Sequence, residues 1–257
     1  MAARFQDPFL VADIGNTRIK WGWCEDGRVT RTAALPDDPD AWRHQLATWH
    51  AEPARRWVLA GVHPDRRDRF AGWLRQLGYE VWVLTHFSQL PLRVQVERPE
   101  QVGIDRLLDV VAARAEISDG ESAVVVDAGS AVTLNVMDPT GAFVGGAIFP
   151  GRRLMAEALY DHTAALPRVA VSHYPPVVPA GTTIHAIAAG IHWAVVGGIR
   201  ALIEQTLLTL PVEKPLRVIL TGGDAADLLP DLRTSEIQWL HRPWLTLEGL
   251  RIVAEHG

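Results

Sequence analysis

The sequence has almost no cysteine. Cys24 is the single cysteine among 257 residues, so the chain by itself can form neither an internal disulfide nor a metal site built from several thiolates. The remaining interpretation is an inert strand residue. The histidines show no HExxH spacing, which argues against a zinc site made by the protein alone. These features exclude a small disulfide-stapled secreted protein and fit a reducing compartment.

No stretch of the sequence is strongly basic. The 25 basic and 30 acidic residues give a net charge of −5 and are interspersed along the chain. Proteins that bind nucleic acid through its phosphates usually present a clustered basic surface. We therefore expect no nucleic-acid partner. With 48% hydrophobic residues, the chain can bury a substantial core in one large or two smaller domains.

An apolar segment of membrane-spanning length is also lacking. The longest uncharged run, residues 184–199, would extend about 24 Å as a helix, less than the roughly 30 Å of a bilayer core. Its glycines and histidines favour a helix packed inside a domain or between subunits. The N-terminal residues contain no long apolar segment of the signal-peptide kind. We therefore expect a cytoplasmic protein with no membrane partner.

What the sequence does contain is an alternation of strand and helix patterns. Apolar segments of strand length alternate with amphipathic segments of helical period, which is typical of an α/β protein. The predicted strands are residues 9–15, 19–25, 56–62 and 79–85, and the predicted helices are residues 39–50, 67–78, 99–117 and 184–199.

One short pattern occurs twice. DIGNT at residues 13–17 and DAGSA at residues 127–131 each place an aspartate, a glycine and a polar side chain directly after an apolar strand. The repeat predicts two similar domains that face each other across a cleft. We place their boundary at the polar break near residue 118, which gives domains of residues 1–118 and 119–257.

These loops have the residue types that phosphate binding requires. Glycine lets backbone amides approach anionic oxygens, a hydroxyl adds a donor, and a carboxylate at a strand end can hold a hydrated magnesium ion. One such loop alone is weak evidence, because aspartate and glycine are common in ordinary turns, but the pair is stronger. The turn Thr221-Gly222-Gly223 follows another apolar strand. It offers bare backbone to an adenosine, or it is only a strand-to-helix turn.

The segment GIDR, residues 103–106, opens a strongly amphipathic helix. Ile104, Leu107 and Leu108 begin its apolar stripe, which places Asp105, Arg106 and Asp109 toward the other side. Taken alone, Asp105 would stabilise the helix N-terminus and Arg106 would pair with Asp109.

The order of these motifs resembles that of type III pantothenate kinases. DIGNT, GIDR, DAGSA, GGAIFPG, GTTIHAIAAG and TGG follow one another over about residues 10–225. The resemblance implies two ribonuclease-H-like domains of the actin-like ATPase superfamily, facing each other across a nucleotide cleft, and a homodimer. It also implies ATP-dependent phosphorylation of pantothenate to 4′-phosphopantothenate, the first step of coenzyme A biosynthesis, with Mg²⁺ and a monovalent cation, K⁺ or NH₄⁺.

The same resemblance implies a role for particular residues. Asp105 matches the general base that takes the proton of the pantothenate hydroxyl, and Asp127 matches an aspartate that helps to bind the monovalent cation. The remaining positions divide between the two substrates. Those expected to contact ATP are Asp13, Ile14, Gly15, Asn16, Thr17, Arg18, Ile19, Lys20 and Ser130, and those expected to contact pantothenate are Val96, Gly103, Ile104, Asp105, Arg106 and Thr183.

Three of these positions carry alternatives. Val96 stands where the family commonly has a substrate-contacting tyrosine, so a phenolic hydrogen bond is missing. Ser130 replaces the usual threonine but keeps the hydroxyl. Thr183 is either a substrate contact or a helix N-cap. Two other functions therefore stay open: a kinase of the same superfamily acting on another small alcohol, and a regulatory or binding homologue with altered catalysis.

Overall fold

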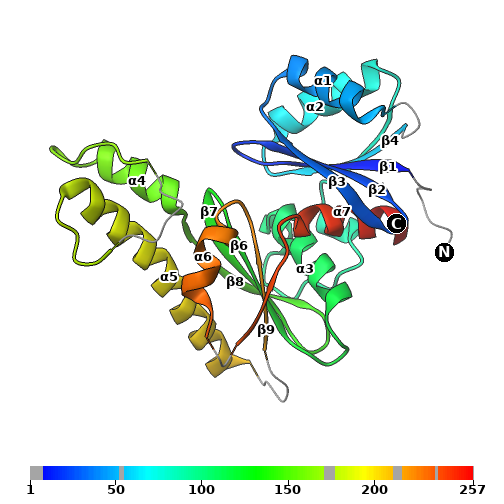
Figure 1. Cartoon of the computed structure of the whole chain (residues 1–257). Helices are drawn as coiled ribbons and strands as arrows, with labels where there is room; N and C mark the ends of the chain where they lie inside the picture. Colours follow the sequence, from blue (N-terminus) through cyan, green and yellow to red (C-terminus); the bar gives the residue numbers. More distant parts are fainter. Residues whose placement is uncertain (1–7, 52–54, 171–176, 211–215, 235–236, 257) are drawn as a thin grey trace. The chain divides into compact units, whose positions relative to one another are not determined.

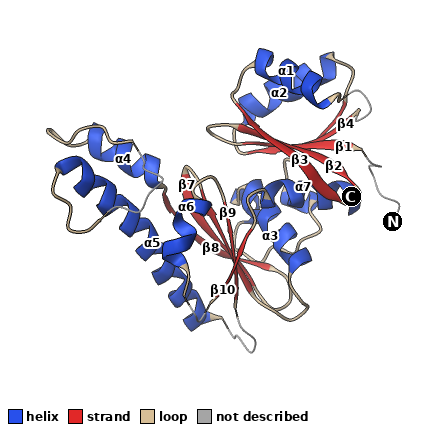
Figure 2. Ribbon diagram, viewed as in Figure 1, coloured by secondary structure: helices blue, strands red, loops and turns tan. Residues whose placement is uncertain are grey.

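The chain forms two units, each built around its own mixed sheet. The computed structural model describes residues 8–51, 55–170, 177–210, 216–234 and 237–256. One unit comprises residues 1–116 and 244–257, and the other comprises residues 117–243. Figure 2 shows the strands of each unit gathered into one sheet with helices beside it.

The first sheet has the strand order β3-β2-β1-β4-β5, with β1 to β3 antiparallel and β4 and β5 parallel to β1. Every residue of β1 is buried, as expected for a strand covered by helices on both faces. In Figure 1, α1 and α2 cover one face of this sheet, and α3 and α7 cover the other. The strands are β1 (Phe9–Ile14), β2 (Ile19–Glu25), β3 (Arg28–Leu35), β4 (Arg56–Gly61) and β5 (Glu80–Val83), and the helices are α1 (Pro39–Trp49), α2 (Pro64–Gln76), α3 (Ile104–Glu116) and α7 (Leu245–His256), with 3₁₀ turns η1 (Phe87–Gln89) and η2 (Pro99–Gln101).

Aromatic side chains fill the space between this sheet and α1 and α2. Trp21, Trp42 and Trp57 are fully buried, and the rings of Trp21 and Trp57 meet edge to face with centroids 4.9 Å apart. Phe70 joins them from α2. Such rings bury large apolar areas, so this cluster helps to hold α1 and α2 to the sheet. Cys24 lies in strand β2, as predicted, and is buried there.

The second sheet repeats the topology of the first. Its order is β10-β9-β6-β7-β8, with β6 to β8 antiparallel and β9 and β10 parallel to β6. The strands are β6 (Ala123–Ala128), β7 (Ala131–Met137), β8 (Phe143–Pro150), β9 (Arg217–Thr221) and β10 (Gln238–His241), and the helices are α4 (Arg152–Asp161), α5 (Thr183–Thr209) and α6 (Ala225–Leu232). The predicted α/β class with two similar halves is therefore confirmed.

The C-terminal helix corrects the predicted division of the chain. The sequence-based boundary assigned residues 119–257 to the second domain, but residues 244–257 group with the first unit. Helix α7 packs on α3 at Gly249, where a Cβ atom would lie 2.2 Å from the carbonyl oxygen of Leu108. Only a residue without a side chain permits this crossing distance.

Helix α5 is longer than its sequence predicted. It runs for 27 residues, about 40 Å at 1.5 Å per residue, so the argument that it is too short to cross a bilayer is wrong. By length and apolarity it is the one candidate span among the described residues, with 44% of its most apolar window buried. Val195, Val196 and Ile199 pack in the core of the second unit. A partly buried core helix passes the same test, so the candidate is weak evidence for a membrane.

Candidate functional site

The first Asp-Gly loop connects β1 to β2 at the end of a fully buried strand. Asp13 is 6% exposed, and its carboxylate lies 3.6 Å from the Nζ of Lys20, its partner across the two strands. The amide of Gly15 donates to the carbonyl of Arg18 at 3.1 Å and closes the turn. Asn16 and Thr17 are exposed at its tip. The loop therefore presents polar groups beside a carboxylate that the strand holds in place.

Two residues of the predicted ATP loop face the core. Ile14 and Ile19 are fully buried, and they pair with each other across β1 and β2. Their side chains anchor the loop, so each can contribute to a ligand only through its backbone. The side chains expected to contact ATP are therefore the polar ones of this stretch, and Ile14 and Ile19 offer only their main chain.

The second Asp-Gly loop occupies the equivalent place between β6 and β7. Gly129 donates its amide to the carbonyl of Ala131 at 3.0 Å, and Asp127 and Ser130 are partly exposed. Ala128 pairs with Val132, which leaves a loop one residue shorter than the first. The repeat detected in the sequence thus corresponds to an equivalent position in the two sheets.

A glycine beside each loop completes the equivalence. Gly61 ends β4 next to Ile14, and a Cβ at Gly61 would lie 2.7 Å from the Ile14 carbonyl oxygen. Gly222 follows β9 with a φ of +96°, and a Cβ there would lie 2.3 Å from the carboxylate of Asp127 and 2.4 Å from the carbonyl oxygen of Ala128. A glycine at the end of β4 and another directly after β9 thus bring their backbone close to the neighbouring loop.

A buried arginine near the second loop, which the sequence motifs did not identify, binds two acidic side chains. Arg152 is 2% exposed and binds the carboxylates of Asp224 at 2.9 Å and Asp227 at 2.8 Å. Burial lowers the pKa of Arg152, but the hydrogen bonds and charges of these two carboxylates outweigh it and raise that pKa. The preceding Gly151 donates its amide to the carbonyl of Ser130 at 3.0 Å. In the sequence, Arg152 directly follows GGAIFPG, but its two acidic partners lie 72 and 75 residues away along the chain.

The GIDR segment places its acid at the first turn of α3. Oδ1 of Asp105 accepts a hydrogen bond from the backbone amide of Arg106 at 2.8 Å. A Cβ atom on Gly103 would lie 2.5 Å from this oxygen. A side chain at Gly103 would therefore displace this carboxylate from its position over the helix start. Burial lowers the pKa of Arg106 more than the carboxylates of Asp105 and Asp109 raise it.

The predicted solvent position of Asp109 is wrong. Asp109 is 1% exposed and accepts the hydroxyl of Thr246 at 2.8 Å. Helix α3 is covered by the sheet on one side and by α7 on another, so its buried face is wider than a single apolar stripe indicates.

A pocket of about 240 Å³ opens at the start of α3 in the first unit. Its lining includes Gly103 and Ile104 of the predicted pantothenate site. The other lining residues combine apolar walls with hydrogen-bonding groups: Gly61, Val62, Pro64, Arg67, Leu84, Thr85, His86, Phe87, Pro99, Glu100, Gln101 and Val102. Val96 is partly buried in the loop before η2 and is not one of these described lining residues. The pocket suits a small molecule with both apolar and polar ends.

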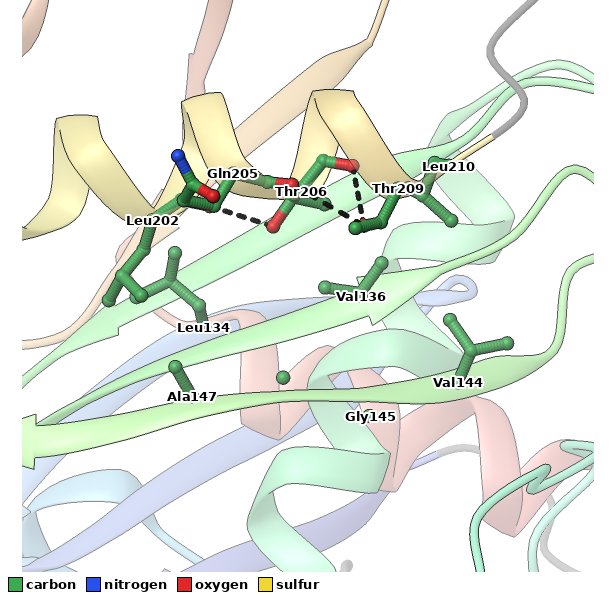
Figure 3. Close-up of a pocket in the computed structure, with 11 residues that line it drawn as sticks. Leu134, Val136, Val144, Gly145, Ala147, Leu202, Gln205, Thr206, Thr209 and Leu210 are labelled. Atoms are coloured by element: carbon green, nitrogen blue, oxygen red, sulfur yellow. Dashed lines mark hydrogen bonds between the residues drawn. The ribbon is translucent and has the colours of Figure 1, made fainter.

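A second groove, of about 320 Å³, lies between α5 and β7 and β8 (Figure 3). Leu134, Val136 and Leu202 form much of its wall. The hydroxyls of Thr206 and Thr209 donate to backbone carbonyls of α5. No charged side chain is among its described lining residues, so it does not have the chemistry of a phosphate or carboxylate site.

The structure separates the two alternatives for Thr183 only in part. Thr182 is the N-cap of α5, and its hydroxyl accepts the amide of His185 at 3.3 Å. The N-cap role therefore belongs to Thr182, and Thr183 is the exposed first residue of the helix.

In the parts of the chain that are described, no cluster of three or more His, Cys, Asp or Glu side chains is arranged to hold a metal ion. Magnesium that accompanies a nucleotide takes one or two carboxylates, several waters and phosphate oxygens, so a single strand-end carboxylate such as Asp13 fits that chemistry.

Comparison with known proteins decides the family. A sequence model of type III pantothenate kinase matches residues 9–205. The chain belongs to the type III pantothenate kinase family. It is 40% identical over 257 residues to the type III pantothenate kinase of Syntrophotalea carbinolica, covering 95% of this chain and 97% of that one. It is 35% identical over 245 residues to the enzyme of a Synechococcus strain, covering 94% and 87%.

Solved structures support the fold of this pantothenate kinase family member. An activator of 2-hydroxyisocaproyl-CoA dehydratase from Clostridium difficile, with bound ADPNP, matches with a TM-score of 0.55 and 11% identity over 96% of this chain and 94% of that one. A polyphosphate/ATP-glucomannokinase from Arthrobacter matches with a TM-score of 0.53 and 16% identity over 97% and 98%. These neighbours have the actin-like ATPase fold, which confirms the predicted fold class.

Proposed function

We propose that this chain transfers the γ-phosphoryl group of ATP to the primary hydroxyl of pantothenate, giving 4′-phosphopantothenate. Family membership supports this reaction and the use of ATP with a divalent metal. The structural observation that carries it is the equivalence of the two loops. Each follows the first strand of a sheet of the same topology, with an aspartate and a bare glycine backbone beside it.

In this proposal, the two Asp-Gly loops bind the phosphates of ATP. The polar residues and amides of the stretch from Asp13 to Lys20 bind the phosphates, and the Ser130 hydroxyl adds a donor from the second loop. Asp13 orients the hydrated magnesium ion, which neutralises charge on the phosphates when it is bound. Lys20, whose ammonium pairs with Asp13, keeps that carboxylate in position. The Thr221-Gly222-Gly223 turn receives the adenosine.

In the same proposal, residues at the start of α3 bind pantothenate, the phosphoryl acceptor. The carboxylate of Asp105 orients the pantothenate hydroxyl and accepts its proton as the phosphoryl group is transferred. Arg106 binds the pantothenate carboxylate through its planar guanidinium. Gly103 and Ile104 line the neighbouring pocket, whose apolar side chains suit the dimethyl group of pantothenate. Val96 and Thr183 are the further expected contacts.

Asp127 is the proposed ligand of a monovalent cation, K⁺ or NH₄⁺. Its carboxylate lies against the backbone of Gly222 and within 3.8 Å of the Cβ position of Gly129. Carboxylate and carbonyl oxygens of this kind suit a hard cation with flexible coordination.

We also infer a cytoplasmic homodimer that binds neither nucleic acid nor membranes. Helix α5 exposes large apolar side chains, among them Trp193 at 41% and Leu208 at 77%. A row of small residues on the same helix, including Gly190 and Gly197, allows another backbone to approach closely. A second copy of the chain would cover this surface, and sedimentation velocity of the native protein and of Trp193→Glu tests the assembly.

The central experiment measures ADP release coupled to pantothenate. Native protein should turn over with ATP, Mg²⁺ and pantothenate, and Asp105→Asn should lose about a hundredfold or more in kcat, the contribution of a positioned acid–base group. Asp40→Asn is the matched control, because Asp40 is an exposed acid of α1 whose side chain is 87% accessible. Native protein that phosphorylates other small alcohols but not pantothenate would refute the assignment. Equal kcat for Asp105→Asn and the control would remove Asp105 from its role.

A further inference from the structure

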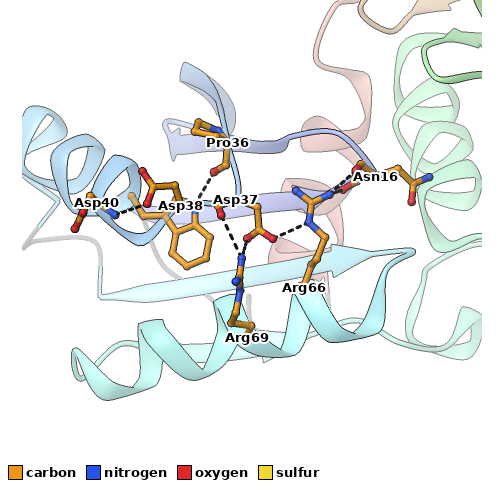
Figure 4. Close-up of polar contacts among 9 residues, drawn as sticks. Asn16, Pro36, Asp37, Asp38, Asp40, Arg66 and Arg69 are labelled. Carbon is orange, nitrogen blue, oxygen red and sulfur yellow. Dashed lines mark hydrogen bonds and ion pairs between the residues drawn. The ribbon is translucent and has the colours of Figure 1, made fainter. Parts of the chain in front are cut away.

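An arginine side chain binds the backbone carbonyls of the first Asp-Gly loop. Arg66 projects from α2, and its Nη1 donates to the carbonyl oxygens of Gly15 at 2.8 Å and Asn16 at 2.5 Å (Figure 4). The Arg66 side chain is 14% exposed. One guanidinium nitrogen thus binds two consecutive carbonyls of the loop.

This contact fixes the direction of two amides. In a trans peptide, the carbonyl oxygen and the N–H of the same unit point in opposite directions. Because Arg66 draws the carbonyls of Gly15 and Asn16 toward itself, the N–H groups of Asn16 and Thr17 point away from it. Successive amides directed to one side form a concave site for an anion. The positive charge behind the carbonyls also polarises both peptide units in the sense that favours an anion at their N–H groups.

A second set of contacts fixes Arg66 itself. Its Nε lies 3.0 Å from Oδ2 of Asp37, in the connection between β3 and α1. Arg69 also pairs with Asp37 and lies over the ring of Trp42, 5.7 Å from its centroid. Burial would raise the pKa of Asp37, but the hydrogen bonds and charges of Arg69 and Arg66 outweigh it and hold that pKa below its ordinary value. Asp37 therefore stays ionised and keeps Arg66 oriented.

Two carbonyls of the second loop are also bound, but by backbone amides and not by a side chain. The carbonyl of Ala128 accepts the backbone amide of Asp224 at 2.9 Å, and the carbonyl of Ser130 accepts that of Gly151 at 3.0 Å. These contacts belong to the main chain, so among single substitutions only proline removes one of their donors. The first loop depends instead on the side chain of Arg66.

We propose that Arg66, oriented by Asp37, is a positioning residue for nucleotide binding: it holds the carbonyls of Gly15 and Asn16 so that the following amides face the phosphates of ATP. The inference rests on the proposed function for the identity of the ligand. Arg66 touches neither substrate and acts through the loop.

The test compares nucleotide affinity with stability. Full-length Arg66→Ala, Arg66→Lys and Asp37→Asn are titrated with Mg-ATP by calorimetry, and steady-state KM values are measured for ATP and pantothenate separately. Arg43→Ala is the matched control, since Arg43 forms an exposed ion pair with Asp40 on the neighbouring helix α1. Thermal melting with and without Mg-ATP accompanies each variant.

The expected result is selective for the nucleotide. Arg66→Ala should weaken ATP binding by about tenfold or more, the usual effect of losing a charge-assisted hydrogen bond, with the pantothenate KM within about twofold of native. Lysine retains the charge but not the fork that joins two carbonyls to Asp37, so Arg66→Lys should restore ATP affinity only in part. Asp37→Asn should fall between native protein and Arg66→Ala. Mg-ATP should raise the melting temperature of Arg43→Ala as in native protein, and raise that of Arg66→Ala less.

Two results would overturn the proposal. One is an ATP affinity of Arg66→Ala equal to that of Arg43→Ala, whatever happens to its melting temperature. The other applies if Arg66→Ala does not fold: Arg66→Lys and Asp37→Asn would then both bind ATP with native affinity. Failure of native protein to phosphorylate pantothenate would refute the proposed function instead, and calorimetric binding of Mg-ATP would still decide the role of Arg66.

Discussion

Neighbouring glycines in the Thr221-Gly222-Gly223 turn should respond very differently to alanine. At Gly222 a Cβ would lie 2.3 Å from the Asp127 carboxylate and 2.4 Å from the Ala128 carbonyl oxygen, and the residue has a φ of +96°. At Gly223 nothing lies within 4 Å of the Cβ position. The pair therefore separates a steric requirement from the general cost or benefit of replacing glycine.

The magnitude follows from two costs at Gly222. A left-handed backbone costs a residue with a Cβ about 1–2 kcal/mol, and forcing an extra carbon into a packed site costs about 1–3 kcal/mol more. We expect Gly222→Ala to lose about 2–5 kcal/mol of unfolding free energy, while Gly223→Ala stays within about 1 kcal/mol of native. The displaced atoms belong to the second loop, so Gly222→Ala should also raise the KM for ATP.

The assay is urea unfolding followed by tryptophan fluorescence, together with ATP kinetics in the coupled ADP assay. Equal unfolding midpoints for the two alanine variants would refute the reasoning, because the close approach of Gly222 to the second loop would then have no energetic consequence.

Three further predictions concern the first unit and the cation. Arg106→Ala should raise the pantothenate KM by about tenfold, and an unchanged KM in steady-state kinetics would mean that Arg106 serves only its helix. The pKa of Asp37 is lowered from 3.8 by the paired arginines against the effect of burial, so its stabilisation is present above that pH and is lost as the pH falls below it through the folded-state pKa. Asp37→Asn should therefore be less stable than native protein in urea at neutral pH, by at most about 1 kcal/mol for a pair of this exposure, and the difference should disappear in strong acid; a constant difference contradicts this. Omitting K⁺ and NH₄⁺ should slow native turnover, and Asp127→Asn should respond less to added K⁺; an equal response would exclude Asp127 as the cation ligand.

Elements with a clear apolar period could be predicted from the sequence. The strands β1, β2 and β4 and the helix α3 lie within the predicted segments, because central strands and amphipathic helices bury continuous or regularly spaced apolar residues. Strand β3 was missed, since none of its residues is fully buried and its apolar residues do not alternate with polar ones. Residues 244–257 were assigned to the wrong unit, because the packing of α7 on α3 joins residues far apart in the chain.

The site could be predicted where the chemistry is local. Asp13, Asp127 and Asp105 each stand in a motif whose residue types can be recognised within a few positions. Arg66 and Arg152 could not be found in this way, because their partners lie about 50 and 72 residues away along the chain. Isolated arginines on amphipathic helices resemble ordinary surface charges until folding brings their acceptors close.

The two units reach a similar loop geometry from sequences that share little beyond an aspartate and a glycine. The fourth strand of each sheet ends in a glycine that approaches the loop, Gly61 in one unit and Gly222 in the other. The carbonyls of the second loop are bound by backbone amides, whereas those of the first are bound by Arg66. Backbone contacts persist through most substitutions, but a side-chain contact is lost with one. Nucleotide affinity should therefore be more sensitive to side-chain changes behind the first loop than behind the second.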